Sequence, residues 1–164
     1  MQRTCHRSMS VGKCLVYVTV VSIFAVFISG AYLSGSGFGA ACGIGGTSLS
    51  SNDWPYCNGS LSFPSNWPAQ VEYLHRLLSV FATVLLVGSS LAVWLMKPRP
   101  TAAARALLLA LVLLLLEVYL GGVVINANLN IVIGTISLAT ATTVFGVLVV
   151  AADRMYLHEK KSCV

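Results

Sequence analysis

Four long apolar segments restrict what this chain can fold into. They cover roughly residues 14–33, 69–96, 106–125 and 131–152. Each reaches about 20 residues, the length that a helix needs to cross a bilayer. Backbone groups in hydrocarbon have to pair within the chain, so each segment is expected to be helical. We therefore predict an all-α fold, an integral membrane four-helix bundle that forms one domain over residues 1–164.

The composition supports a multi-pass protein of the cell membrane. Hydrophobic residues make up 57% of the chain and charged residues 9%, whereas a soluble domain carries about 25% charged residues. The first apolar segment is also longer than the apolar run of a typical cleaved signal peptide, so we expect it to remain as a helix.

The positions of the basic residues predict the orientation in the membrane. Loops 34–68 and 126–130 contain no Lys or Arg. Nine basic residues lie before, between or after the helices on the other side: Arg3, Arg7, Lys13, Lys97, Arg99, Arg105, Arg154, Lys160 and Lys161. By the positive-inside rule both termini are expected in the cytoplasm and the long loop 34–68 outside. This placement accounts for the net charge of +5, and we expect no nucleic-acid partner.

The long outer loop contains two of the five cysteines, Cys42 and Cys57. Compartments outside the cytoplasm favour oxidation, so the pair fits one disulfide, and two free thiols are the alternative. The chain has no C-x-x-C motif, which disfavours a thiol oxidoreductase. Residues 58–60 form an N-glycosylation triplet, a pattern that also arises by chance.

Three ionisable residues lie near the start of the second apolar segment, namely Glu72, His75 and Arg76. Their spacing of i, i+3 and i+4 places them on one face of a helix. Ionisable groups inside a membrane usually face the bundle interior and mark function. Histidine commonly ligates haem iron, and the adjacent Arg76 could pair with a haem propionate. The alternative is an ion pair of Glu72 with Arg76 at the membrane surface, with His75 uninvolved.

Glu117 is a second acid within an apolar segment, about two turns below the outer surface. We expect its carboxyl group to form a hydrogen bond between helices, and a functional role is the alternative. The remaining histidines, His6 and His158, fall in the cytoplasmic tails and are poor candidates for a membrane site.

Three sequence motifs together resemble the haem A synthase family, the cytochrome oxidase assembly proteins that convert haem O to haem A. They read "SGSGFGAAC", "NDWPYCNG" and "EYLHR". The matching residues are Gly35, Gly37, Cys42, Asp53, Trp54, Pro55, Cys57, Asn58, Gly59, Glu72, His75 and Arg76. The resemblance extends over about residues 25–140. Most members have eight helices in two similar halves, and this chain resembles one half, like the short four-helix forms of archaea.

The resemblance implies roles for these residues. Glu72 would be the catalytic or substrate-positioning acid, and as the catalytic acid it would stabilise positive charge that develops at the attacked carbon. His75 would be an axial ligand of haem iron, in haem b or in the substrate haem O, with Arg76 beside it in the cofactor site. Cys42 and Cys57 would form the family's outer-loop disulfide. The product, haem A, would serve assembly of a terminal oxidase, with that oxidase or a haem O synthase as possible partners.

The chain departs from the family pattern in three places. The stretch "GIGGTSLSS" lengthens the spacing between the cysteines, and Glu117 stands where Gln is expected. Thr135 stands where the fourth helix should carry a second histidine, so one such bundle cannot form a bis-histidine haem site. A five-coordinate iron, a second ligand from another copy in a homo-oligomer, and a non-catalytic haem-binding or assembly protein of the same fold are the alternatives.

Overall fold

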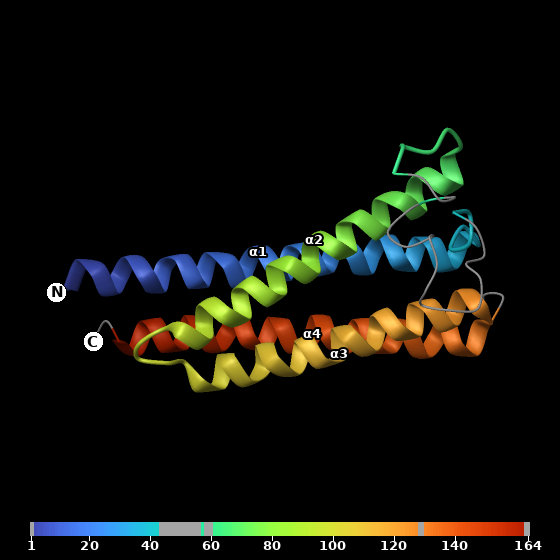
Figure 1. Ribbon diagram of the computed structural model, residues 1–164. Helices are drawn as coiled ribbons and strands as arrows, with labels where there is room; N and C mark the ends of the chain where they lie inside the picture. Colours follow the sequence, from blue (N-terminus) through green and yellow to red (C-terminus); the bar gives the residue numbers. More distant parts are fainter. Residues whose placement is uncertain (1, 43–56, 58–60, 128–129, 163–164) are drawn as a thin grey trace.

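The computed structural model describes residues 2–42, 57, 61–127 and 130–162. The glycosylation triplet, the family motif around Asp53 and the insertion between the cysteines lie outside these residues. Within them the chain forms four helices: α1 (Gln2–Ser36), α2 (Trp67–Leu95), α3 (Thr101–Asn126) and α4 (Ile131–Ser162) (Figure 1). All four are long and apolar enough to cross a membrane. The predicted all-α, multi-pass membrane fold is confirmed.

Local signals in the sequence account for the ends of α2. At its start the side chain of Asn66 caps the helix, because Asn66 Oδ1 accepts a hydrogen bond of 2.9 Å from the amide of Ala69. Such caps satisfy amides that have no partner within the helix. The helix ends at Leu95, shortly before Pro98, because proline disfavours helical conformation in the residue before it.

Three of the helices extend further than the apolar segments predicted. α1 begins at Gln2, α3 at Thr101, and α4 continues to Ser162. Hydropathy detects only the part of a helix that lies in hydrocarbon, and nothing between residues 2 and 13 breaks a helix. In the case of α3, the alanines that follow Pro100 are the strongest helix formers, so the helix starts directly after the proline.

The helices form a ring in which each one contacts two others: α1 packs on α2 and α4, and α3 packs on α2 and α4. Figure 1 shows both chain termini at one end of the bundle, which we call the terminal end. The described residues between α1 and α2 lie at the opposite end, which we call the loop end. α2 runs at an angle to the other three helices (Figure 1).

The main core occupies the terminal half and the centre of the bundle. Its fully buried side chains include Val16 of α1, Leu86 of α2, Leu107 of α3 and Leu148 of α4. Towards the loop end this continuous packing gives way to a cavity, so the terminal half provides the rigid frame on which a site at the loop end is built.

Candidate functional site

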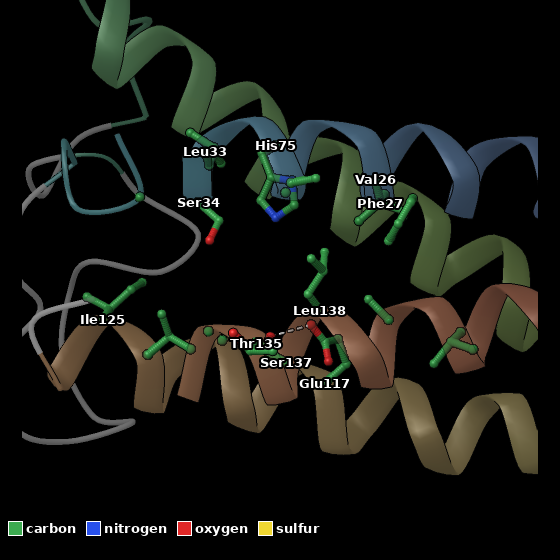
Figure 2. A pocket seen from close by; sticks show the side chains of 18 of the residues that line it. Val26, Phe27, Leu33, Ser34, His75, Glu117, Ile125, Thr135, Ser137 and Leu138 are labelled. Carbon is green, nitrogen blue, oxygen red and sulfur yellow. Dashed lines mark hydrogen bonds between the residues drawn. The ribbon is translucent and has the colours of Figure 1, made fainter. Parts of the chain in front are cut away.

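A cavity of about 400 Å³ lies in the loop half of the bundle (Figure 2). Its wall is apolar near the middle of the helices, where Ile23, Leu114 and Val144 line it. Polar side chains gather nearer the loop end; they are Ser34, His75, Glu117, Asn130, Thr135 and Ser137. Ligand pockets usually measure about 300–1,000 Å³ and combine mostly apolar walls with a few placed polar groups. The cavity therefore has the size and lining of a ligand site.

His75 is the residue through which α2 lines this cavity. Figure 2 shows its imidazole ring pointing into the cavity. The ring nitrogen Nδ1 is 2.8 Å from Ser29 Oγ of α1. Gly30, the next residue, allows a close approach, because a Cβ atom there would lie 3.2 Å from His75 Cε1. Ser29 and Gly30 of α1 together fix the position of the His75 imidazole.

Glu117 of α3 lies on the wall across the cavity from His75 (Figure 2). Its Oε1 accepts a hydrogen bond of 2.6 Å from Ser137 Oγ, which joins α3 to α4. Its Oε2 is buried and has no hydrogen-bond partner among the described residues. Leaving a buried acceptor without a partner costs about 1–3 kcal/mol. A buried polar atom of this kind calls for an explanation, and a bound ligand group is one.

Thr135 also lines the cavity, at the position where the resemblance led us to look for histidine. Its hydroxyl donates a hydrogen bond of 2.8 Å to the carbonyl of Ile131, one turn earlier in α4. The hydroxyl is therefore engaged within its own helix, and His75 is the one histidine that lines the cavity in the described part of the chain.

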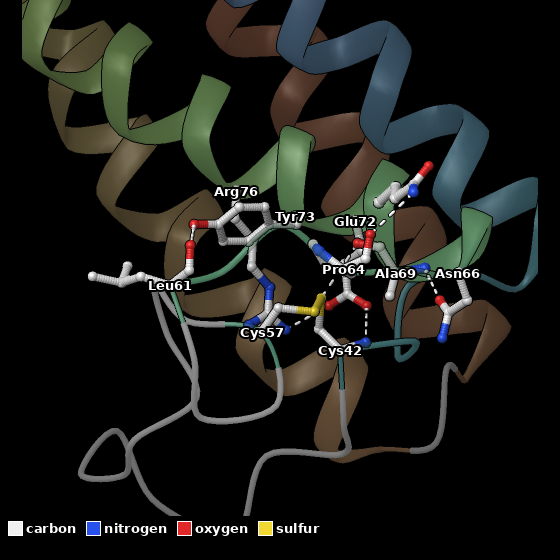
Figure 3. Close-up of a disulfide and its surroundings, with 10 residues drawn as sticks. Cys42, Cys57, Leu61, Pro64, Asn66, Ala69, Glu72, Tyr73 and Arg76 are labelled. Atoms are coloured by element: carbon white, nitrogen blue, oxygen red, sulfur yellow. Dashed lines mark hydrogen bonds and ion pairs between the residues drawn. A yellow bond between two sulfur atoms is a disulfide. The ribbon is translucent and has the colours of Figure 1, made fainter.

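A second polar cluster lies at the loop end, around a disulfide between Cys42 and Cys57 (Figure 3). The structure thus confirms the predicted disulfide. Glu72 is 2% exposed, and its Oε2 accepts a hydrogen bond of 2.7 Å from the amide of Cys42. Its Oε1 accepts one of 2.5 Å from Arg76 Nη2. Glu72 thus links α2 to the segment that leaves α1.

The three ionisable residues of α2 divide between these two clusters. A residue turns the helix by about 100°, so His75 lies about 60° to one side of Glu72 and Arg76 about 40° to the other. Glu72 and Arg76 therefore pair beneath the disulfide, while His75 faces α1 and the cavity (Figures 2 and 3). The cavity lining includes neither Glu72 nor Arg76. The guanidinium of Arg76, which we considered for a haem propionate, forms an ion pair with Glu72.

Three contributors to the site did not stand out in the sequence. Ser29, Gly30 and Ser137 are small residues inside apolar helices, where they commonly serve only helix packing. Their roles follow from the register between helices, which brings Ser29 and Gly30 to His75 and Ser137 to Glu117. Tyr73 was also missed; its hydroxyl donates a hydrogen bond of 2.9 Å to the carbonyl of Leu61 at the loop end.

The names of curated relatives of this chain refer to haem metabolism. A haem A synthase of Bacillus licheniformis is 32% identical over 85 residues, covering 52% of this chain and 25% of the relative. A haem A synthase of Bacillus pumilus is 26% identical over 120 residues, covering 72% and 36%. A protohaem IX farnesyltransferase of Natronomonas pharaonis is 30% identical over 137 residues, covering 83% and 26%.

The chain therefore spans between 25% and 36% of the length of these relatives. No solved structure matches it. A family model described as cytochrome oxidase assembly protein matches residues 4–149, which is most of the chain. By this match the chain belongs to the cytochrome oxidase assembly protein family that includes the haem A synthases.

Proposed function

We propose that this protein is a haem A synthase-type membrane enzyme that binds haem O in the cavity and oxidises one of its methyl groups to the formyl group of haem A. The observation that carries the proposal is the position of His75, an imidazole that points into a mostly apolar cavity inside a membrane bundle. Family membership supports the same reading.

The residues present fit a haem group. The imidazole of His75 would ligate the haem iron. The nitrogen Nε2 has no hydrogen bond in the described part of the chain, whereas Nδ1 contacts Ser29. Apolar side chains such as Phe27 and Val144 suit a porphyrin and its prenyl tail, and the polar side chains near the loop end suit the polar edge of the ligand.

Bound haem would supply the iron redox chemistry, and the protein would bind and orient it. Conversion of a methyl to a formyl group consumes one water and releases four protons and four electrons, which an external electron acceptor has to take up. Apolar walls around Ile23 and Leu114 would limit side reactions with bulk water. Glu117, with one oxygen held by Ser137, is placed to contact the ligand with the other.

The catalytic role for Glu72 remains a proposal, because both of its oxygens are already hydrogen-bonded. We infer that Glu72 contributes to the site in part by holding the segment that lines the cavity in position. It anchors the amide of Cys42, and Gly39, three residues earlier, lines the cavity. Its buried charge could additionally stabilise positive charge at the ligand, as the resemblance implies. Arg76 would hold Glu72 in place.

The orientation and the partners are part of the same proposal. By the positive-inside rule, the basic residues near the terminal end predict that this end lies in the cytoplasm. The disulfide would then lie outside, where oxidation is favoured. Haem O would arrive from a haem O synthase, and haem A would pass to a terminal oxidase. In a homo-oligomer, another copy of the chain would supply a second ligand to the haem iron.

A second candidate function is a haem carrier without catalysis. Among the residues that the structure describes, one histidine lines the cavity, and the hydroxyl of Thr135 is hydrogen-bonded within its own helix. The site could then hold haem through His75 and pass it on unchanged.

Product analysis separates the two functions. Purified protein in detergent is incubated with haem O and an electron acceptor, and the haem is extracted and identified by mass. An enzyme yields haem in which one methyl has lost two hydrogens and gained one oxygen, and the yield falls to background in His75→Ala. Stoichiometric binding with no product supports the carrier. Absence of haem binding by the unaltered protein refutes both.

A further inference from the structure

We propose that Ser29 is a positioning residue that fixes the tautomer of His75, so that Nδ1 carries the proton and Nε2 offers its lone pair to the cavity. The inference rests on the proposed function in naming iron as the partner of Nε2. The tautomer itself is a property of the protein without haem and is measured without it.

The proton of the Ser29 hydroxyl is already committed within α1. Ser29 Oγ donates a hydrogen bond of 2.9 Å to the carbonyl of Val26 in its own helix. The same Oγ lies 2.8 Å from His75 Nδ1. A hydroxyl has one proton and two acceptor lone pairs. The carbonyl of Val26 can only accept a hydrogen bond, so the O–H of Ser29 donates to it. In the contact between Ser29 and His75, Nδ1–H is therefore the donor and Ser29 Oγ the acceptor.

A neutral imidazole carries one N–H, so protonation at Nδ1 leaves Nε2 unprotonated. A ring nitrogen ligates a metal through its lone pair. The hydrogen bond donated by one ring nitrogen determines that the other nitrogen is the metal ligand. The chain of contacts from Val26 through Ser29 to His75 therefore prepares Nε2 as the ligand atom before any ligand enters.

Gly30 fixes the orientation of the ring alongside this hydrogen bond. A Cβ atom at Gly30 would lie 3.2 Å from Cε1 and 3.9 Å from each ring nitrogen, so the ring edge rests on the backbone of α1. The neighbouring residues Ser29 and Gly30 thus have separate effects: the hydroxyl sets the proton position and the missing side chain gives the ring room. Loss of an outer hydrogen-bond partner of a metal ligand typically lowers metal affinity about 10–100-fold.

Nitrogen-15 NMR of histidine side chains in the purified, haem-free protein tests the proposal. The His75 signals are assigned by their loss in His75→Ala. In the unaltered protein we expect Nδ1 to show the shift of a protonated nitrogen and Nε2 that of an unprotonated one. Ser29→Ala should lose this preference and lower haem affinity about 10–100-fold. Ser29→Thr keeps the hydroxyl and should restore both.

Ser36→Ala is the matched control. Ser36 lies on the same helix, and its hydroxyl also donates to a carbonyl three residues earlier, that of Leu33, at 3.4 Å. It should leave the His75 signals unchanged. A proton on Nε2 in the unaltered protein overturns the proposal, and so does an unchanged tautomer in Ser29→Ala. If the tautomer is as proposed but the unaltered protein binds no haem, the positioning role of Ser29 stands and the haem function fails.

Discussion

Replacing Glu72 by Ala should destabilise the protein severely, whatever its part in catalysis. Glu72 and Arg76 are 2% and 7% exposed, so the change leaves a buried guanidinium without its carboxylate and the amide of Cys42 without its acceptor. Breaking a buried ion pair on one side costs about 3–5 kcal/mol. We expect the free energy of unfolding to fall by that amount.

A second substitution separates the two contributions. In Glu72→Ala/Arg76→Met the buried positive charge is gone, while the amide of Cys42 still lacks its acceptor. An unpaired buried amide costs about 1–3 kcal/mol, less than the one-sided loss of a buried ion pair, so the double variant should be more stable than the single one. Glu159→Gln is the control; it breaks the ion pair with Lys13, whose side chain is 29% exposed, and solvent makes such pairs weak.

The assay is unfolding of the haem-free, disulfide-bonded protein in mixed micelles of mild detergent and dodecyl sulfate, followed by far-ultraviolet circular dichroism. A loss below about 1 kcal/mol for Glu72→Ala would refute the reasoning, because it falls under the expected cost of a broken buried pair. A double variant less stable than the single one would refute it as well, since it would mean that the other contacts of Arg76 outweigh the cost of burying its charge without Glu72.

Three further substitutions test other parts of the site. Cys57→Ala opens the disulfide, which spans 15 residues, and should lower stability by about 3 kcal/mol on the chain-entropy account; equal denaturation midpoints with and without the disulfide would contradict this. Gly30→Ala should displace His75 and weaken haem binding in an optical titration, while Gly88→Ala, whose added Cβ meets no atom within 4 Å, should not; equal affinities would show that the close approach is unimportant. Glu117→Leu removes a buried oxygen that has no partner among the described residues, so it should raise the unfolding midpoint and weaken haem binding. A less stable variant with unchanged haem affinity would exclude a ligand role for Glu117.

The sequence predicted the fold well because apolar length is a direct signal. The four segments and the disulfide of Cys42 with Cys57 were predicted and are present. The helix ends were predicted less well, since hydropathy does not report helix outside the membrane. Residues 2–13 continue α1 even though they are polar.

The site was predicted only in part, because the spacing of residues in one helix does not say what the next helix offers. Glu72, His75 and Arg76 were expected to act together on one face. In the structure the carboxylate of Glu72 bonds to the amide of Cys42, whereas the imidazole of His75 bonds to Ser29. Both partners belong to α1 or the segment after it, and their register against α2 depends on side-chain packing that no pattern in the sequence reports.

His75 is the residue that we propose holds haem in the cavity. The decisive measurement is an optical titration of haem into the purified unaltered protein and into His75→Ala, in detergent and with matched folding by circular dichroism. The unaltered protein should bind haem with the spectrum of a histidine-ligated iron, and His75→Ala should lose that spectrum. The same spectrum and affinity in both proteins would contradict the central claim.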